Sequence, residues 1–257
     1  MLPAEREQNI INYLKQNKKA TVHELSISFN VHEATIRRDL KSLEQFNQIK
    51  RTHGGVVLRS DEVVDELDFH DRESSYIIEK ECIGKKAAEF VEEGDTIIID
   101  SGSTTFQFAK QLINKSELTI ITNDIHIASI LKSSQNKVIV TGGILYKDNY
   151  ILNGYITNEV LSGLNPTKLF LGTPAIHYNH GVTHYSEELS PAKKIMVKQS
   201  KEVFLLTDSS KFDKVSLHNI CSLSKIDTLV TDNTNNNYDY EKYKQNIKQF
   251  IKVDVQK

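Results

Sequence analysis

Short apolar runs that alternate with helical segments constrain the fold of this chain more than any other feature. Each run is rich in Ile, Val, Leu or Phe and spans only five or six residues, which is typical of a buried strand. The candidate strands are 96–100, 118–122, 137–141, 168–173, 202–207 and 227–231. Helical spacing marks segments around them at 80–91, 104–113, 125–132 and 188–200. This alternation predicts an α/β fold with a mostly parallel sheet, and we expect a polar helix over 239–251 to end the chain.

Small polar residues follow three of the predicted strands. They form the segments Asp100–Thr105, Thr122-Asn123 and Gly142-Gly143. Because the carboxyl ends of parallel strands meet at one edge of a sheet, ligands bind there. In the first segment, Asp100-Ser101-Gly102-Ser103-Thr104-Thr105, free backbone N–H groups at a helix start meet hydroxyl donors, which suits a phosphate or a carboxylate. The alternative is an ordinary strand-to-helix turn with Ser and Thr caps, and the pattern alone does not separate the two.

A fourth polar turn follows the candidate strand 202–207. Here Asp208 could accept sugar hydroxyls and Lys211 could neutralise a phosphate, while the alternative is a surface Asp/Ser turn. Three histidines, His177, His180 and His184, invite a metal hypothesis. Their spacing is loose and no thiolate accompanies them, so we favour a polar loop over the pocket and predict no metal and no cofactor.

The N-terminal 58 residues have a different pattern, with three helices predicted at 3–17, 22–29 and 33–46. Thr21 and Glu24 have the spacing of a capping box at the start of the second helix. Asn30 suits the left-handed conformation that ends it. Two short helices joined by a tight turn indicate a helix-turn-helix.

The third helix has two distinct faces. Ile36, Leu40 and Leu43 form its apolar stripe. The opposite face carries Thr35, Arg38, Lys41, Ser42 and Gln45, and Arg37 flanks them. Such a helix fits the major groove of DNA, where Arg recognises guanine and Thr contacts a base edge or a phosphate. Alone, a solvated surface helix would be the simpler interpretation; the neighbouring segments favour DNA.

A hairpin is predicted directly after this helix. Apolar and basic residues alternate on either side of Gly54-Gly55, a pair that allows a tight turn. A hairpin in this place is a wing, and Lys50, Arg51 and His53 would place it on phosphates. Gly54 joins the predicted DNA-binding residues. His53 could instead be an ordinary turn residue.

Together these motifs resemble the DeoR family of bacterial sugar-metabolism repressors. The match consists of Thr35-Ile-Arg-Arg-Asp-Leu-(x)₂-Leu-Glu followed by Arg51-(x)-His-Gly-Gly, and then the polar strand ends in the same order. Phe69-(x)₂-Arg72 and Glu79-Lys80 resemble the family's sequence at the start of its second domain. His32 and Asn47 depart from the usual Ser and Gly, and His32 is the weaker helix cap, at a cost of about 1 kcal/mol.

The resemblance implies both a fold and a function. The fold would be an N-terminal winged helix-turn-helix followed by a sensor domain similar to the pentose-phosphate isomerase and CoA-transferase fold. The sensor would bind a phosphorylated sugar or related metabolite, and Lys193 also matches the family. Thr21 joins the predicted DNA-binding residues. The partners would then be double-stranded operator DNA and this metabolite.

Composition agrees with two domains in a cytoplasmic protein. We predict a DNA-binding domain at 1–58, a linker at 59–78 and an effector-binding domain at 79–257. Residues 1–58 carry nine Lys/Arg against six Asp/Glu, a net charge of +3, and the rest carries −5. No apolar run approaches the roughly 18 residues that span a bilayer, and the charged start predicts no signal peptide. Cys82 and Cys221 fit a reducing compartment.

Three functions remain to be compared. The first is a repressor, a homodimer or homotetramer on paired half-sites, that a phosphorylated metabolite releases from a carbohydrate operon. The second is a sugar-phosphate isomerase-like enzyme with a regulatory DNA-binding domain, which needs a placed carboxylate base; Asp100, Glu187, Glu188 and Asp208 are available. The third, an architectural DNA binder, leaves the α/β domain without a purpose. We favour the first, which is not an enzyme.

Overall fold

The computed structural model describes residues 3–17, 19–45, 49–52, 55–58, 69–146, 149–235 and 238–255. The chain forms two compact units, Met1–Val63 and Val64–Lys257. The first contains α1 (Pro3–Asn17), β1 (Lys19–Ala20), α2 (Val22–Phe29), α3 (Glu33–Gln45), β2 (Ile49–Thr52) and β3 (Gly55–Leu58). Its strands form a sheet in the order β1-β3-β2. The predicted winged helix-turn-helix is confirmed, and the short strand β1 is an addition that the sequence did not indicate.

The core of this first unit explains its helix spacing. Ile10 and Leu14 of α1, Leu25 of α2 and the Ile36–Leu40–Leu43 stripe of α3 are all buried in one cluster. The close approach of β1 also explains Gly55. A side chain there would lie 2.4 Å from the Ala20 carbonyl oxygen, and the φ angle of +153° is one that L-residues rarely adopt.

A seven-stranded sheet organises the second unit, in the order β15-β14-β12-β9-β4-β5-β6. All six strand pairings are parallel, so the predicted mostly parallel α/β fold is confirmed. The strands are β4 (Thr96–Ile99), β5 (Thr119–Thr122), β6 (Lys137–Val140), β9 (Lys168–Gly172), β12 (Glu202–Leu206), β14 (Thr228–Asp232) and β15 (Gln249–Val253).

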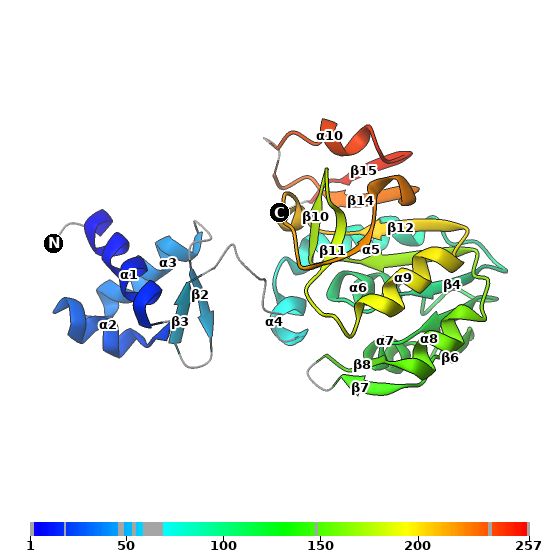
Figure 1. Ribbon diagram of the computed structural model, residues 1–257, viewed down its shortest axis with the longest axis horizontal. Helices are drawn as coiled ribbons and strands as arrows, with labels where there is room; N and C mark the ends of the chain where they lie inside the picture. Colours follow the sequence, from blue (N-terminus) through cyan, green and yellow to red (C-terminus); the bar gives the residue numbers. More distant parts are fainter. Residues whose placement is uncertain are drawn as a thin grey trace. The chain divides into compact units, whose positions relative to one another are not determined.

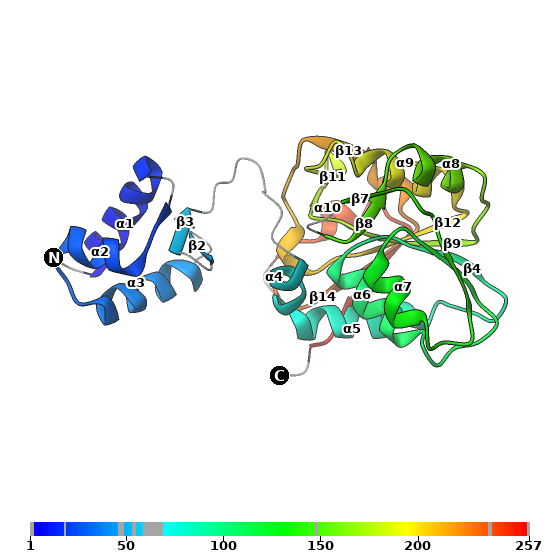
Figure 2. The same cartoon turned by 90° about the horizontal axis from the view of Figure 1, so that it is seen from below.

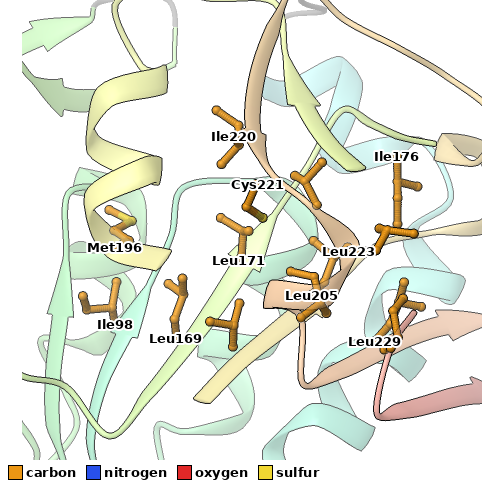
Figure 3. Close-up of a cluster of buried hydrophobic side chains, with 14 of the residues drawn as sticks. Ile98, Leu169, Leu171, Ile176, Met196, Leu205, Ile220, Cys221, Leu223 and Leu229 are labelled. Carbon is orange, nitrogen blue, oxygen red and sulfur yellow. The ribbon is translucent and has the colours of Figure 1, made fainter. Parts of the chain in front are cut away.

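Helices cover both faces of this sheet (Figures 1 and 2). On one face lie α5 (Ile77–Ala88), α6 (Ser103–Gln111) and α7 (Ile125–Leu131), and α4 (Phe69–Ser74) packs against α6. On the other lie α8 (Tyr155–Ser162) and α9 (Ser190–Gln199). Because side chains alternate along a strand, Ile97 and Ile99 enter one core and Ile98 enters the other. Figure 3 shows the second core, where Met196 of α9 lies near Ile98 and Leu169.

Smaller strands complete the unit. The hairpin of β7 (Ile144–Tyr146) and β8 (Ile151–Asn153) follows β6 in the chain and forms a two-stranded sheet of its own. A three-stranded sheet joins β10 (Ala175–His177), β11 (Gly181–His184) and β13 (His218–Cys221). None of these strands, nor α8, was predicted. Among the described residues, both cysteines are free thiols, and no helix is long and apolar enough to cross a membrane.

The predicted terminal helix over 239–251 is wrong. The structure has a single turn there, α10 (Glu241–Lys244), followed by β15, which pairs in parallel with β14. Phe250 packs on one core while Ile251 and Val253 pack on the other. Lysines on either side of these apolar residues hide the alternation in the sequence, and pairing with β14 overrides local helical propensity.

Candidate functional site

The outer face of α3 is a basic surface with one arginine already engaged. Arg37, Arg38 and Lys41 are exposed, and Thr35 and Ser42 are half-buried. The Arg37 guanidinium donates to Glu33 at 2.7 Å along the helix. Among the described residues, no ion pair is formed by Arg38. Arg38 is therefore the arginine of this face that is better placed to meet a base edge.

A buried ion pair fixes α3 against α1. The Arg6 guanidinium donates to both carboxylate oxygens of Asp39, at 2.5 and 2.9 Å. This two-pronged geometry is the strongest that an arginine makes with a carboxylate. Asp39 follows Arg38 directly, so the pair sets the orientation of the basic face.

Thr21 has a structural task in this unit. Its hydroxyl accepts from the Glu24 backbone N–H at 3.1 Å, and the Glu24 carboxylate accepts from the Thr21 N–H at 2.7 Å. The predicted capping box is confirmed, and Asn30 ends α2 in the left-handed conformation. The contact of Thr21 with DNA stays a prediction. In the wing, β2 contains Arg51, whose side chain lies outside the described residues, as do His53 and Gly54.

In the second unit, the chain reverses its direction across the sheet between β4 and β9. From β4 it proceeds to β5 and β6 on one side; it then returns to β9 and proceeds to β12, β14 and β15 on the other. Ligands of open α/β sheets bind at such a switch point, beyond the carboxyl ends of the strands. The residues that follow β4 and β9 therefore occupy the place where a ligand is expected.

Asp100 and Lys193 form a buried ion pair at this switch point. Asp100 follows β4 and is fully buried, and one of its oxygens, Oδ2, accepts from the Lys193 ammonium and from the Gly172 N–H at 3.0 Å. Gly172 ends β9, so the carboxylate joins the two strands. The other oxygen, Oδ1, is buried without a hydrogen-bond partner among the described residues. Burial raises the pKa of Asp100, and the Lys193 ammonium opposes that rise.

The segment after Asp100 opens α6 as predicted. Gly102 is the N-cap residue and provides no side-chain cap. The Thr105 hydroxyl donates back to the Gly102 carbonyl at 2.9 Å. Ser101, Ser103 and Thr104 are almost fully buried beside it. Uncapped N–H groups and hydroxyls therefore meet at the positive end of the helix dipole.

A second buried carboxylate lies at the end of β12. Asp208 Oδ1 accepts from the Ser210 N–H at 3.1 Å, whereas Oδ2 has no partner in the described part of the chain. Burial alone would raise its pKa, but Lys211, the Ser210 hydroxyl and Lys80 hold the pKa below its ordinary value. Lys80 is itself buried, and burial lowers its pKa to about 8.

The ends of β5 and β6 are tied to neighbouring structure. The Thr122 hydroxyl accepts from the Asp124 N–H at 3.1 Å, and the Asn123 amide donates to the Leu152 carbonyl at 3.0 Å. Gly142 and Gly143 have φ angles of +71° and +126°. A side chain at Gly143 would lie 2.5 Å from the Asn153 carbonyl oxygen. These four residues therefore have structural tasks, and their contact with a ligand stays a prediction.

The three histidines do not gather into a metal site. His177 and His180 lie at the β10–β11 hairpin with ring centres 5.0 Å apart. His184 is buried separately, and its Nδ1 accepts from the Ser186 N–H at 3.1 Å. Burial, assisted by the Lys193 charge, lowers the pKa of His184 to about 2. No group of three or more potential ligands is arranged around a metal in the residues that the structure describes.

Several residues of this edge were not predicted as site residues. Arg72, Lys80 and Asp124 bring further buried or half-buried charge to it, and burial raises the pKa of Asp124 to about 6. We call the charged residues of the edge the strand-end cluster: Arg72, Lys80, Asp100, Asp124, Lys193, Asp208 and Lys211. The resemblance to the family within Phe69–Lys80 was the one sequence signal that could have identified two of these residues, Arg72 and Lys80.

Known proteins match this chain along most of its length. A family model described as "DeoR-like helix-turn-helix domain" matches residues 6–62, and one described as "DeoR C terminal sensor domain" matches residues 76–233. The HTH-type transcriptional regulator GolR of Listeria innocua is 36% identical over 95% of this chain and 96% of its own. The glycerol-3-phosphate regulon repressor of Escherichia coli is 33% identical over 90% and 92%.

Among solved structures, ribose 5-phosphate isomerase A from Methanocaldococcus jannaschii aligns with a TM-score of 0.41 and 16% identity over 54% of this chain and 55% of its own. The two family matches lie on the two units, and the relatives named here are aligned through both. The chain belongs to the DeoR family of helix-turn-helix transcriptional regulators.

Proposed function

We propose that this protein represses a carbohydrate-metabolism operon and that a phosphorylated sugar or related metabolite releases it from its operator. The observation that carries the effector half is the Asp100–Lys193 pair at the topological switch point. A buried carboxylate oxygen without a partner costs free energy unless a ligand or water satisfies it. The E. coli relative, named for a glycerol-3-phosphate regulon, supports a phosphorylated effector.

The DNA half rests on the basic face of α3. Arg38 and Thr35 would contact base edges, and Arg37, Lys41 and Ser42 would contact the backbone. Arg51, His53 and Gly54 of the wing and Thr21 at the start of α2 would contribute further phosphate contacts. Because helix-turn-helix modules read paired half-sites, we propose that the protein acts as a homodimer or homotetramer, in the cytoplasm.

The effector half assigns roles by charge. Lys193 and Lys211 would neutralise the phosphate, together with the N–H groups and hydroxyls of the segment Ser101-Gly102-Ser103-Thr104-Thr105. Asp100 and Asp208 would accept hydrogen bonds from sugar hydroxyls through the carboxylate oxygens that have no partner among the described residues. Thr122, Asn123, Gly142 and Gly143 would border the same edge. For release to occur, the effector must bind the DNA-free form more tightly than the DNA-bound form.

We infer that the protein is not an enzyme. The relatives that match its whole length are named as regulators. The isomerase-like alternative needs a carboxylate base, for which Asp100, Glu187, Glu188 and Asp208 are available. The bonds of Asp100 to Lys193 and to the Gly172 N–H suit a fixed binding group better than a base. Interconversion of an aldose phosphate and a ketose phosphate by purified protein would favour the alternative.

The test is fluorescence anisotropy of the full chain on DNA from upstream of its own operon, titrated with a panel of sugar phosphates at constant salt. We expect sequence-specific binding that at least one phosphate weakens. Arg38→Ala should weaken specific binding by about 1–3 kcal/mol if Arg38 reads a base. Lys198→Ala, an exposed change on α9, is the matched control. Absence of sequence-specific binding would refute the repressor, and binding that no phosphate alters would refute only the effector half.

A further inference from the structure

Helix α4 is the first described element after the DNA-binding unit. It is anchored near the carboxyl ends of the strands, where a ligand is expected. Phe69 is buried, with its ring centre 5.6 Å from that of Phe106 on α6 and 4.5 Å from that of His126 on α7. Phe106 lies in the first turn of the helix whose start forms the predicted phosphate cradle. Glu73 adds an ion pair of 3.8 Å to Lys110 of α6.

Lys80 ties the end of α4 to the strand-end cluster. Its buried ammonium donates to the carbonyls of Arg72 and Ser75, the latter at 2.6 Å. Cations at the carboxyl end of a helix stabilise it through its dipole. The charges of Asp208 and Lys211, at the end of β12, act on the same ammonium.

Arg72 extends in the other direction, toward the end of β5. Its guanidinium donates to the Asn149 Oδ1 at 2.5 Å. The loop that carries Asn149 is bound to the strand end, because the Tyr150 carbonyl accepts from the Ile125 N–H at 3.0 Å. The Arg72 charge acts on Asp124, on His184 and on Lys80. In the sheet order, β5 and β12 flank the β4–β9 switch point. Arg72 of α4 therefore brings charge to the β5 side, and Lys80 of α5, which is bonded to the end of α4, brings charge to the β12 side.

We propose that Arg72 binds the anionic group of the effector, and that α4 thereby couples occupancy of the strand-end cluster to the segment leading from the DNA-binding unit. This inference rests on the proposed effector function. It adds Arg72 as a binding residue and α4 as the element that transmits binding. A phosphate is a better acceptor for a guanidinium than a neutral amide is, and it can accept two parallel bonds. A bound anion would therefore draw Arg72 away from Asn149 and shift α4, which carries it.

The experiment uses the full chain and inorganic phosphate as the probe. Isothermal titration calorimetry measures phosphate affinity, and hydrogen–deuterium exchange measures protection of residues 69–76 with and without phosphate. The variants are Arg72→Met, Arg72→Lys and, as the charge-matched control, Lys85→Met on the exposed side of α5. Urea denaturation shows whether each variant retains the wild-type fold.

We expect Arg72→Met to weaken phosphate binding at least tenfold, Arg72→Lys to weaken it less, and Lys85→Met to change it less than twofold. Phosphate should alter exchange in residues 69–76 of the wild type and not of folded Arg72→Met. The inference is overturned if Arg72→Met binds phosphate as tightly as Lys85→Met does, or if phosphate does not change hydrogen–deuterium exchange in α4. In either case the proposed effector function stands. If the wild type binds neither phosphate nor any sugar phosphate, the effector function itself fails.

Discussion

The β4–β9 strand pair carries a buried lysine–aspartate ion pair at each of its two ends. At the amino ends, Asp95 accepts from the Lys168 ammonium at 2.6 Å and from the Glu92 N–H at 2.8 Å through Oδ2, and from the Thr167 hydroxyl at 3.0 Å through Oδ1. At the carboxyl ends, Asp100 accepts through Oδ2, and its Oδ1 has no hydrogen-bond partner in the part of the chain that the structure describes. The two pairs share strands, charges and chemistry, and differ in whether the carboxylate is satisfied.

This difference separates a structural ion pair from a binding site. A buried pair whose acceptors are all used holds strands in register and has no bonding capacity left for a ligand. A pair with an unused buried oxygen retains both a cation and an acceptor, at a cost in stability that a ligand can relieve. The amino-end pair should therefore matter for folding alone, and the carboxyl-end pair for effector response.

The largest expected effect comes from removing the lysine of the carboxyl-end pair. Lys193→Met should weaken the effector's ability to release the operator by about 100-fold, or about 2.7 kcal/mol, because the site loses the buried cation that would pair with the anion. Anisotropy of the protein–operator complex measures this release. Lys194→Met, an exposed neighbour, is the control and should respond like the wild type. Equal release by Lys193→Met would remove Lys193 from the site.

Removing the lysine of the amino-end pair should act on stability. Lys168→Met leaves Asp95 largely buried without its cation, which should lower the free energy of unfolding by about 2 kcal/mol. Urea denaturation of the full chain measures this change. If Lys168→Met instead altered effector response while stability stayed the same, the distinction between the two ends would be lost.

The carboxyl end also buries a histidine, which should make this unit sensitive to acid. The pKa of His184 is about 2 in the folded chain and about 6.5 when unfolded. The stabilising contribution of neutral His184 is therefore complete above about pH 6.5 and falls by about 1.4 kcal/mol for each pH unit below it. Asp124, with its raised pKa, acts in the opposite sense between about pH 6 and 4.

The measurement is urea denaturation of wild type and His184→Gln between pH 7.5 and 5. The difference between the two proteins isolates the histidine, because both retain Asp124. We expect His184→Gln to lose less stability than the wild type as the pH falls. Parallel pH profiles would contradict this expectation, because they would show that folding does not shift the pKa of His184.

The smallest effect concerns the end of β6, where the structure gives the polar residues packing tasks. The buried Thr157 hydroxyl donates to the Gly142 carbonyl at 2.6 Å. Thr157→Val should cost about 1 kcal/mol of stability and leave effector affinity within twofold, as judged by denaturation and calorimetry. A larger loss of affinity than of stability would instead make this strand end part of the binding site.

The sequence predicted the main strands and the position of Asp100 because both leave local signals. Ile97–Ile99 form an apolar run, and polar residues follow it directly. Other features arise only when distant segments meet. The Gly172 N–H that binds Asp100 is a backbone group with no signature, and Asp124 resembles an ordinary helix-capping residue until the fold buries it.

Strands at the edges of the fold were the other source of error in the predicted secondary structure. In β15, the lysines beside Phe250 and Ile251 gave the segment a helical and polar appearance, and only pairing with β14 makes it a strand. The hairpin β7–β8 behind Gly143 was missed in the same way. Short elements with weak patterns depend on tertiary contacts, which a single sequence does not contain.

The most direct test is calorimetric titration of wild type, Lys193→Met and Lys168→Met with a sugar phosphate that releases the operator, and with the same sugar without its phosphate. We predict that wild type and Lys168→Met bind the phosphorylated sugar alike, that Lys193→Met binds it about 100-fold more weakly, and that the unphosphorylated sugar binds none of them measurably. If both lysine variants lost affinity equally, or if neither did, the carboxyl-end pair would not be the effector site.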